Sequence, residues 1–177
     1  MERILKNIPD SGVIVIDGRC GAGKTTLAET LAKALDCPVV HMDHFFLPRK
    51  MQTDARLALG NIHYERFSEE VIPFLGSSFS YRPWDCRAQA MGDPIRVEKS
   101  RYTVVEGSYS MHPVFGKYFD FGIFIDISPE RQTERLVARE GTRYEMFREK
   151  WIPLEEAYFA AFSVRESADI VINGGER

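Results

Sequence analysis

A glycine-rich run near the N-terminus constrains this chain more than any other feature. Residues 18–25 read Gly-Arg-Cys-Gly-Ala-Gly-Lys-Thr and match the pattern G-x-x-x-x-G-K-[ST] at every required position. The apolar run Val13 to Ile16 precedes it, and a helix-forming stretch from Leu27 to Leu35 follows it. Glycines let successive backbone N–H groups turn toward a phosphate chain, and the following helix directs the positive end of its dipole at the same anion. The pattern predicts a site for the phosphates of a nucleoside triphosphate.

Each polar residue of this loop has a predicted role. Lys24 reaches the β- and γ-phosphates, and the Thr25 hydroxyl holds Mg²⁺. The residues predicted to bind the nucleotide are Gly18, Gly21, Ala22, Gly23, Lys24, Thr25 and Thr26.

A dinucleotide-binding loop is the alternative for the same residues. Gly21 and Gly23 match its first two glycines, and Asp43 stands where a ribose-binding acid belongs. The third glycine is absent because Thr26 occupies its position, and Lys24 would have no role. The triphosphate interpretation is therefore favoured.

The bulk properties are those of a soluble globular protein. A chain of 177 residues predicts one domain spanning residues 1–177, and 44% hydrophobic with 28% charged residues is ordinary for this class. The net charge of −3 gives no reason to expect a nucleic-acid partner, and no apolar run approaches the ~20 residues of a membrane helix. The oligomeric state stays open, a homo-oligomer included.

The three cysteines favour a cytoplasmic protein with reduced thiols. Cys20, Cys37 and Cys86 are scattered and have no CxxC spacing, so they indicate neither a disulfide framework nor a zinc site. Cys20 lies inside the phosphate loop, where we interpret it as a small filler residue rather than a reactive thiol.

Five apolar runs predict buried parallel strands. They alternate with helical patterns, and this alternation indicates an α/β domain whose ligands gather at the carboxyl ends of the strands. The predicted strands are Val13 to Ile16, Val39 to Met42, Tyr102 to Val105, Gly122 to Ile127 and Asp169 to Ile172. The segment 76–100 departs from this alternation of strands and helices. It is predicted to be an excursion on the acceptor side, with a hairpin formed by Ser80 to Trp84 and Ile95 to Glu98. Pro153 is expected to kink or divide the last long helix.

Two carboxylates follow predicted strands. Asp43 comes after the second strand, where it can accept a proton from an attacking hydroxyl or hold a water on Mg²⁺, and Glu106 ends the third, beside the phosphate loop. Thr25, Glu106 and Asp43 are the predicted metal site. The alternative for either acid is a strand-end residue that caps a helix. Asp17 and Asp126 are interpreted as structural.

Arginine recurs every fourth residue after the fourth strand. Arg131, Arg135, Arg139 and Arg143 form one stripe if they share a helix. Guanidinium groups pair with phosphate oxygens through a planar fork, so the stripe predicts a short lid over residues 135–148. Nearby glutamates offer the alternative of a solvated surface of ion pairs, which we favour for Arg131.

Aromatic and histidine side chains are candidates for an acceptor pocket. His44 neighbours Asp43. The aromatic residues that could wall the pocket are Phe45, Phe46, Tyr64, Phe67, Tyr81 and Trp84. Core packing is the alternative for the aromatic residues.

These motifs together resemble the uridine kinase branch of the P-loop kinases. The resemblance covers nearly the whole chain and rests on the phosphate loop, Met42 to Pro48, Val104 to Gly107, Phe121 to Pro129 and Ala168 to Ile172. It implies a P-loop NTPase three-layer sandwich, with helices on both faces of a five-stranded parallel sheet in the order 2-3-1-4-5.

The resemblance also implies residue roles. Asp43 would be the catalytic base, Glu106 would assist the metal, and Lys24, Arg139 and Arg143 would act in catalysis, with Arg135 a weaker lid match on the nucleotide. ATP and Mg²⁺ would be the cofactors. The sequence departs from the family in its shorter lid and in the stretch Asn61 to Tyr64, which lacks the acid used on the nucleoside ribose.

The sequence therefore predicts an ATP-dependent kinase that transfers the γ-phosphoryl group to a hydroxyl of a small metabolite, as uridine kinases do. Alternatives are a kinase for another small alcohol, of the pantothenate, glycerate, sugar or nicotinamide riboside type, or an ATPase or switch with no acceptor. A guanine-selective switch would carry an Asn-Lys-x-Asp segment, which is absent. A kinase for RNA or DNA ends would need a basic groove that the sequence does not reveal.

Overall fold

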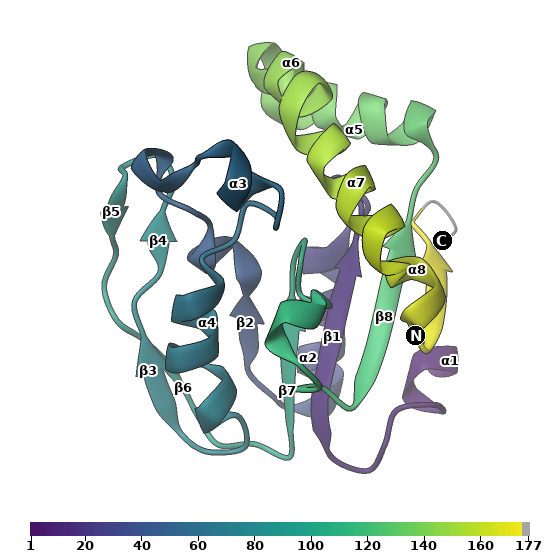
Figure 1. Ribbon diagram of the computed structural model, residues 1–177. Helices are drawn as coiled ribbons and strands as arrows, with labels where there is room; N and C mark the ends of the chain where they lie inside the picture. The colour runs from purple at the N-terminus through teal and green to yellow at the C-terminus, as the bar shows by residue number, and fades with distance from the viewer. Residues whose placement is uncertain (175–177) are drawn as a thin grey trace.

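A five-stranded parallel sheet forms the centre of the computed structural model, which describes residues 1–174 (Figure 1). Across the sheet the strands are β2 (Val39–His41), β7 (Tyr102–Glu106), β1 (Gly12–Gly18), β8 (Phe121–Asp126) and β9 (Ile170–Asn173). Counted along the chain, this is the order 2-3-1-4-5, which confirms the expected topology. The last three positions of the predicted domain, 175–177, lie outside the described residues.

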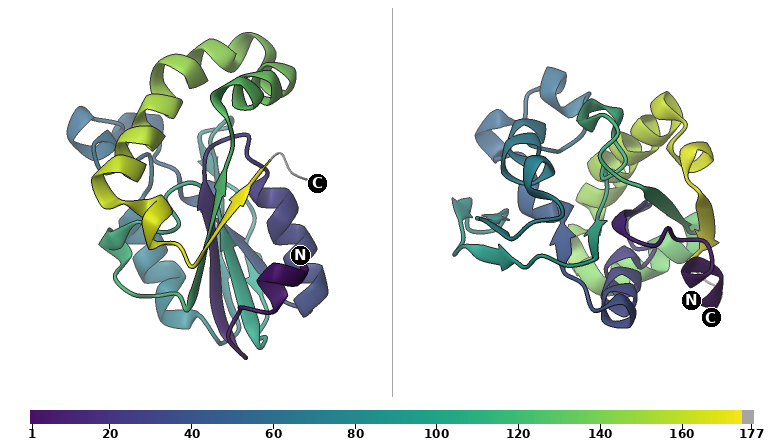
Figure 2. Two further views of the ribbon diagram at one scale, coloured as in Figure 1. Left: turned by 90° about the vertical axis from the view of Figure 1, so that its right-hand side faces the viewer. Right: turned by 90° about the horizontal axis from the view of Figure 1, so that it is seen from below.

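Both faces of the sheet are covered because its strands are apolar on both sides. In β1, Val13 and Val15 pack with one buried cluster, while Ile14 and Ile16 pack with the other. Helices α4 (Tyr64–Glu70), α7 (Ile152–Phe162) and α8 (Val164–Ser167) cover the first face, and α1 (Glu2–Leu5) and α2 (Lys24–Leu35) cover the second (Figure 2). Alternation of side chains along a strand produces this division.

Helix α2 starts earlier than its apolar pattern indicates. It begins at Lys24, directly after Gly23, whose φ of 104° lies in the left-handed region that glycine tolerates. Ala28 and Leu31 are fully buried against the sheet. The early start places Lys24 and Thr25 in the first turn of the helix, where unpaired backbone N–H groups point at the site.

The segment between α4 and β7 forms two short ribbons rather than one hairpin. Strand β3 (Phe79–Tyr81) pairs antiparallel with β6 (Ile95–Val97), and β4 (Trp84–Asp85) pairs with β5 (Ala90–Met91). The expected strand from Ser80 to Trp84 is broken at Arg82-Pro83, because proline has no N–H to donate to a ladder. The second ribbon therefore projects as a separate unit.

The arginine-rich helix, α5 (Pro129–Glu140), ends before Arg143. Gly141, with a φ of 58°, terminates it, and a 3₁₀ turn (Gly141–Arg143), α6 (Tyr144–Met146) and a π-helical segment (Phe147–Trp151) lead into α7. The expectation of one four-arginine stripe is thus wrong for Arg143, which lies beyond the break. Pro153 sits in the first turn of α7, where its missing N–H costs no hydrogen bond, so the long helix is divided just before it.

Short helical turns complete the architecture. They are η1 (Met42–Phe45), η2 (Arg49–Met51), α3 (Asp54–Leu57), η3 (Ile72–Phe74) and η4 (Pro113–Phe115). Met42 belongs to η1 rather than to the strand expected to end there. Among residues 1–174, no helix has the length and apolar character needed to cross a membrane.

Candidate active site

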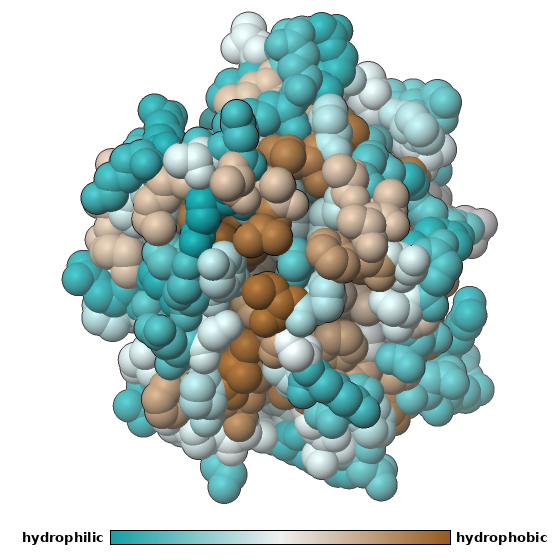
Figure 3. Space-filling view, in the orientation of Figure 1, coloured by the Kyte–Doolittle hydropathy of each residue, from teal (hydrophilic) through white to brown (hydrophobic). Residues whose placement is uncertain are grey.

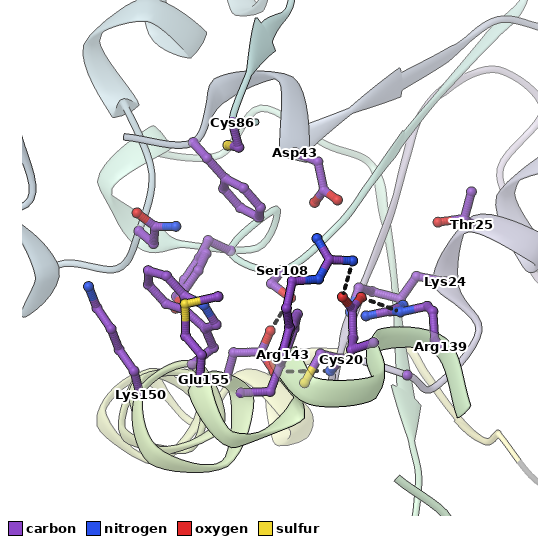
Figure 4. A pocket seen from close by; sticks show the side chains of 18 of the residues that line it. Cys20, Lys24, Thr25, Asp43, Cys86, Ser108, Arg139, Arg143, Lys150 and Glu155 are labelled. Carbon is purple, nitrogen blue, oxygen red and sulfur yellow. Dashed lines mark hydrogen bonds and ion pairs between the residues drawn. The ribbon is translucent and has the colours of Figure 1, made fainter. Parts of the chain in front are cut away.

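A cavity of about 920 Å³ opens at the carboxyl ends of β1, β2 and β7. The phosphate loop and α2 bound it on one side, η1 and η2 on another, and the segment from α5 to α7 crosses over it (Figure 4). The face shown in Figure 3 is hollowed between α4 and α7, with apolar side chains gathered along the hollow. This is the edge of the sheet where an α/β fold places its ligands.

The phosphate loop folds as its glycines require. A Cβ on Gly18 would lie 2.1 Å from the carbonyl oxygen of Ile125, so only glycine fits there. Nζ of Lys24 donates to the carbonyl oxygens of Gly18, at 2.6 Å, and Arg19, at 3.1 Å. The ammonium group of Lys24 therefore lies against the backbone of the phosphate loop.

The predicted nucleotide-binding residues divide by position. Those that line the cavity are Gly21, Gly23, Lys24, Thr25 and Thr26. Ala22 is buried in the loop, and Gly18 lies at the end of β1. Arg135 lies outside the cavity lining, where its Nη1 donates to the carbonyl oxygens of Gly21 (3.1 Å) and Ala22 (3.2 Å).

A buried carboxylate that the sequence analysis missed supports the loop from below. Oε2 of Glu155, on α7, accepts the N–H of Cys20 at 3.0 Å, and its Oε1 accepts the hydroxyl of Ser108 at 2.5 Å. Burial raises the pKa of the Cys20 thiol far above its ordinary value, which leaves the thiol protonated and unreactive. Asp17 is also structural: it accepts the N–H groups of Gly18 and Met111 and the hydroxyl of Tyr158.

Asp126 lies in an ion-pair network outside the cavity. It pairs with Arg19 and with Arg165, and Nε of Arg19 also lies 2.5 Å from Oε1 of Glu156. The network joins the phosphate loop to β8, α7 and α8, in agreement with a structural role.

Two of the three predicted metal ligands, Thr25 and Glu106, are in contact, and the third, Asp43, lines the same cavity. Oγ1 of Thr25 lies 3.2 Å from Oε1 of Glu106, and Nδ1 of His41 lies 2.6 Å from the same oxygen. This hydrogen bond raises the pKa of His41 above its ordinary value. The sequence analysis missed the role of His41, although strand pairing sets it directly beside Glu106.

The donor set fits magnesium. Within the described residues, no cluster of three or more His, Cys, Asp or Glu side chains is arranged to hold a metal ion. Mg²⁺ is ordinarily held by one or two protein oxygens, with waters and substrate phosphates completing its octahedron. A hydroxyl beside one carboxylate, next to a phosphate loop, matches that requirement.

Asp43 points into the cavity (Figure 4) and is exposed to it. Desolvation by the surrounding protein and, second, the charge of Glu106 raise the pKa of Asp43 to about 6, against the opposing effects of Lys24 and His41. A carboxylate with a pKa near 6 ionises close to neutral pH and still accepts a proton readily. Its place in the cavity is compatible with the predicted role of Asp43 as a general base.

Glu140 holds both predicted lid arginines over the cavity. Nε of Arg139 lies 2.9 Å from its Oε1, and Nη2 of Arg143 lies 2.8 Å from its Oε2. Both guanidinium groups are about half exposed, at 55% and 48%, whereas Glu140 is 12% exposed. Folding of the chain beyond Gly141 therefore returns Arg143 to Arg139 even though they do not share a helix.

Most of the other predicted acceptor residues lie away from the cavity lining. Phe45 is fully buried and packs edge-on against Phe67, and Tyr81 is 3% exposed, with its hydroxyl 2.9 Å from Nδ1 of His44. Burial lowers the pKa of His44 to about 4. Trp84 also lies outside the lining. Tyr81 packs against Phe45 and His44 of η1, which keeps these side chains out of the cavity, whereas Asp43 and Phe46 line it.

Residues from five separate segments line the rest of the cavity. They are Phe46, Leu47, Arg49, Gln52, Asn61, Cys86, Arg87, Gln89, Tyr109, Met146, Phe147, Lys150 and Trp151. The sequence analysis named Phe46 and missed the others, because they share no motif and no periodicity. Most of them lie in segments that follow strands, whereas Met146, Phe147, Lys150 and Trp151 come from the helical segment before α7.

Comparison with known proteins supports the fold. No family model matches the chain. A cytidylate kinase of Pyrobaculum arsenaticum is 27% identical over 148 residues, which cover 82% of this chain and 65% of that protein, so the chain spans less than two thirds of its relative. A structure of a possible uridine kinase from Bacillus stearothermophilus superimposes with a TM-score of 0.73 at 19% identity, covering 96% of this chain and 94% of the other.

A shikimate kinase from Bacteroides thetaiotaomicron is more distant, with a TM-score of 0.53 at 18% identity over 93% of this chain and 89% of the other. Sheet order, phosphate loop and these likenesses define the fold of the P-loop kinases. Within that class, the chain has the fold of the uridine kinase-like proteins.

Proposed function

We propose that this protein is an ATP-dependent kinase that transfers the γ-phosphoryl group to a hydroxyl group of a small molecule. One observation carries the proposal: a single cavity brings together Lys24, Thr25 with Glu106, and Asp43. A phosphate site alone would serve any nucleoside triphosphatase. The base with raised pKa beside it is what an acceptor hydroxyl requires.

The loop and the lid hold the nucleotide. Backbone N–H groups of the loop and the first turn of α2 bind the phosphates, and Lys24 exchanges its two carbonyl partners for phosphate oxygens. The likeness of fold to kinases supports ATP as the donor. Arg139 and Arg143 turn from Glu140 to the transferred group, where guanidinium groups stabilise the charge spread over its oxygens.

Magnesium would be held by the Thr25 hydroxyl, with Glu106 ordering its waters, and it would neutralise charge on the phosphates when bound. His41 keeps Glu106 in place through its hydrogen bond of 2.6 Å.

Asp43 takes the acceptor proton. The acceptor oxygen forms a bond to the γ-phosphorus while the bond from that phosphorus to the β,γ-bridging oxygen breaks and ADP leaves. The hydroxyl proton passes to the Asp43 carboxylate, whose pKa of about 6 suits it to accept and later release the proton. Alignment and electrostatics supply most of the acceleration, because phosphoryl transfer needs little covalent work from a protein.

The test compares a variant of the proposed phosphate-binding lysine with a variant of the proposed base. Lys24→Ala should weaken ATP binding. Asp43→Asn should leave ATP binding intact and lower turnover by ~10²–10⁴, the usual contribution of a positioned base. ADP release is measured with and without a panel of nucleosides and sugar-like alcohols, and products are identified by mass spectrometry. A slow release of ADP that no alcohol accelerates supports an ATPase or switch instead. Unimpaired turnover in Asp43→Asn rejects the assignment of Asp43 as the base.

A further inference from the structure

Three cationic side chains line the cavity on the side of the acceptor. Arg49 comes from η2, Arg87 from the turn between β4 and β5, and Lys150 from the π-helical segment before α7. In the part of the chain that the structure describes, none of the three lies within 4.0 Å of a carboxylate oxygen. Figure 4 shows Lys150 at the opposite end of the cavity from Lys24 and Thr25.

Three of the four carboxylates that line the cavity are engaged by other residues. Glu106 contacts Thr25 and His41, Glu140 holds the lid arginines, and Glu155 binds the phosphate loop and Ser108. Asp43 is the proposed base. The remote end is therefore positive although the chain carries a net charge of −3. A local field of this sign inside a concave site attracts anions.

A chain of hydrogen bonds holds Lys150 in place. Its Nζ donates to Oε1 of Gln52 at 3.1 Å, and Nε2 of Gln52 donates to Oδ1 of Asn61 at 3.3 Å. The ammonium group also lies 4.4 Å from the centre of the Trp151 ring. An ammonium group offers three donors, so Lys150 retains capacity for a ligand while these contacts fix its position.

The two arginines are joined through the second ribbon. The backbone N–H of Arg49 donates to Oε1 of Gln89 at 3.0 Å, which ties η2 to the turn that carries Arg87. The Asp85 carboxylate accepts the backbone N–H groups of Arg87 and Ala88 and forms no ion pair with the Arg87 guanidinium among the described residues. Guanidinium forks suit both carboxylate and phosphate oxygens.

We infer that the acceptor carries an anionic group, a carboxylate or a phosphate, on the part of the molecule remote from the accepting hydroxyl, and that Arg49, Arg87 and Lys150 bind it. The inference rests on the proposed function, since it names the substrate class of the same cavity. The hydroxyl faces Asp43, and the anion faces the end that holds Lys150. Gln52, Asn61 and Gln89 supply the surrounding polar contacts.

The experiment measures binding and transfer separately. Calorimetry is performed on the full chain saturated with Mg²⁺ and a non-hydrolysable ATP analogue, so that the phosphate loop is filled. The probes are glycerol, glycerate and glycerol 3-phosphate, together with cytidine and cytidine 5′-monophosphate. Glycerate against glycerol 3-phosphate separates carboxylate from phosphate recognition. Transfer from ATP to each probe is followed by mass spectrometry.

Lys150→Met is the test variant and Lys50→Met is its matched control. Lys50 is exposed on η2 and does not line the cavity. Anionic probes should bind more tightly than their neutral counterparts, and Lys150→Met should weaken them by about 10- to 100-fold while sparing neutral probes, since a charged hydrogen bond is lost. Lys50→Met should bind as the unsubstituted chain does.

Two results overturn the inference. One is an affinity for every anionic probe no higher than for its neutral partner, absence of binding included. The other is an anion preference that survives in Lys150→Met and in a variant lacking all three cations. Phosphorylation of neutral alcohols alone would uphold the proposed function and reject the inference. Anion binding at this end without transfer to any probe would uphold the anion site and count against the proposed kinase function.

Discussion

The hydroxyl of Thr25 and the carboxylate of Glu106 lie 3.2 Å apart although 81 positions separate them in the sequence. β1 and β7 are neighbours in the sheet. Glu106 is the last residue of β7, and Thr25 lies in the first turn of the helix that follows β1, so both residues lie at the same edge of the sheet. The contact joins the two halves of the proposed magnesium site. His41, on the next strand, completes it through Glu106.

Glu106→Gln should raise the magnesium concentration needed for half-maximal activity by about 10- to 100-fold, the usual cost of losing a residue that orients a metal's shell. The amide keeps the shape of the carboxylate and removes its charge. Titration of ADP release with Mg²⁺ measures the change. Binding of ATP without metal should be nearly unaffected, and an unchanged magnesium requirement would contradict the assigned role.

The pH dependence of kcat/KM should show an acid limb near pH 6. Asp43 must be ionised to accept a proton, and burial raises its pKa to about 6, so activity should fall as the pH drops through 6 and level off above it. Initial rates between pH 5 and 8 measure the profile. In Asp43→Asn the limb should vanish from the residual activity; a limb that persists would assign it to another group, with His41 the neighbouring candidate.

Arg143→Gln should lower kcat by ~10²-fold, the cost of removing one preorganised donor from a developing charge. Glu140→Gln should instead tighten binding of MgATP by about two- to five-fold, because the arginines no longer have to leave a half-exposed ion pair worth under ~1 kcal/mol. Arg148→Gln is the control, since Arg148 pairs with Glu145 outside the cavity. Equal effects of the Arg143 and Arg148 substitutions would place Arg143 on the solvated surface.

Because of Asp17, the free energy of unfolding should fall as the pH rises from about 4 to about 6. Burial raises its pKa in the folded state from 3.8 to about 6, so over this window the unfolded chain loses the proton first. The contribution of Asp17 to the free energy of unfolding is fully present below pH 4 and is lost above pH 6. A pKa difference of two units between the folded and unfolded states corresponds to about 3 kcal/mol. Urea unfolding at several pH values, compared between the unsubstituted chain and Asp17→Asn, isolates this component.

Tyr158→Phe provides a check on the same group. The Tyr158 hydroxyl donates to Oδ2 of Asp17 at 2.8 Å and holds the pKa of Asp17 lower than burial alone would set it. Its removal should move the end of the window above pH 6. Identical pH profiles for the Tyr158→Phe chain and the unsubstituted chain would show that Asp17 does not govern this part of the curve.

Much of the fold could be read from local patterns. Runs such as Val13 to Ile16 are apolar at every position, which suits strands covered on both faces, and the sheet order agrees with that implied by the resemblance to uridine kinases. The errors arose where one residue changed the backbone. Pro83 divides the predicted hairpin, and Gly141 ends the arginine-rich helix. Each effect depends on the backbone conformation of a single residue, which the hydrophobic pattern of a whole segment does not reveal.

The acceptor end could not have been predicted in the same way. Phe45 and Tyr81 have the aromatic character expected of pocket residues, yet both are buried in the core. Arg87 and Lys150 reach the cavity from segments that share no motif. Aromatic residues serve cores and pockets equally well, so residue type alone does not separate the two.

The sequence by itself determined the phosphate site, because consecutive backbone N–H groups, glycines and the start of one helix create it within a single stretch of chain. It also placed Asp43 and Glu106 at strand ends, since parallel strands present those ends at one edge. Only the tertiary structure decided what surrounds them. The Lys150 to Gln52 contact and the return of Arg143 to Glu140 depend on long-range packing, in which residues distant along the chain become neighbours.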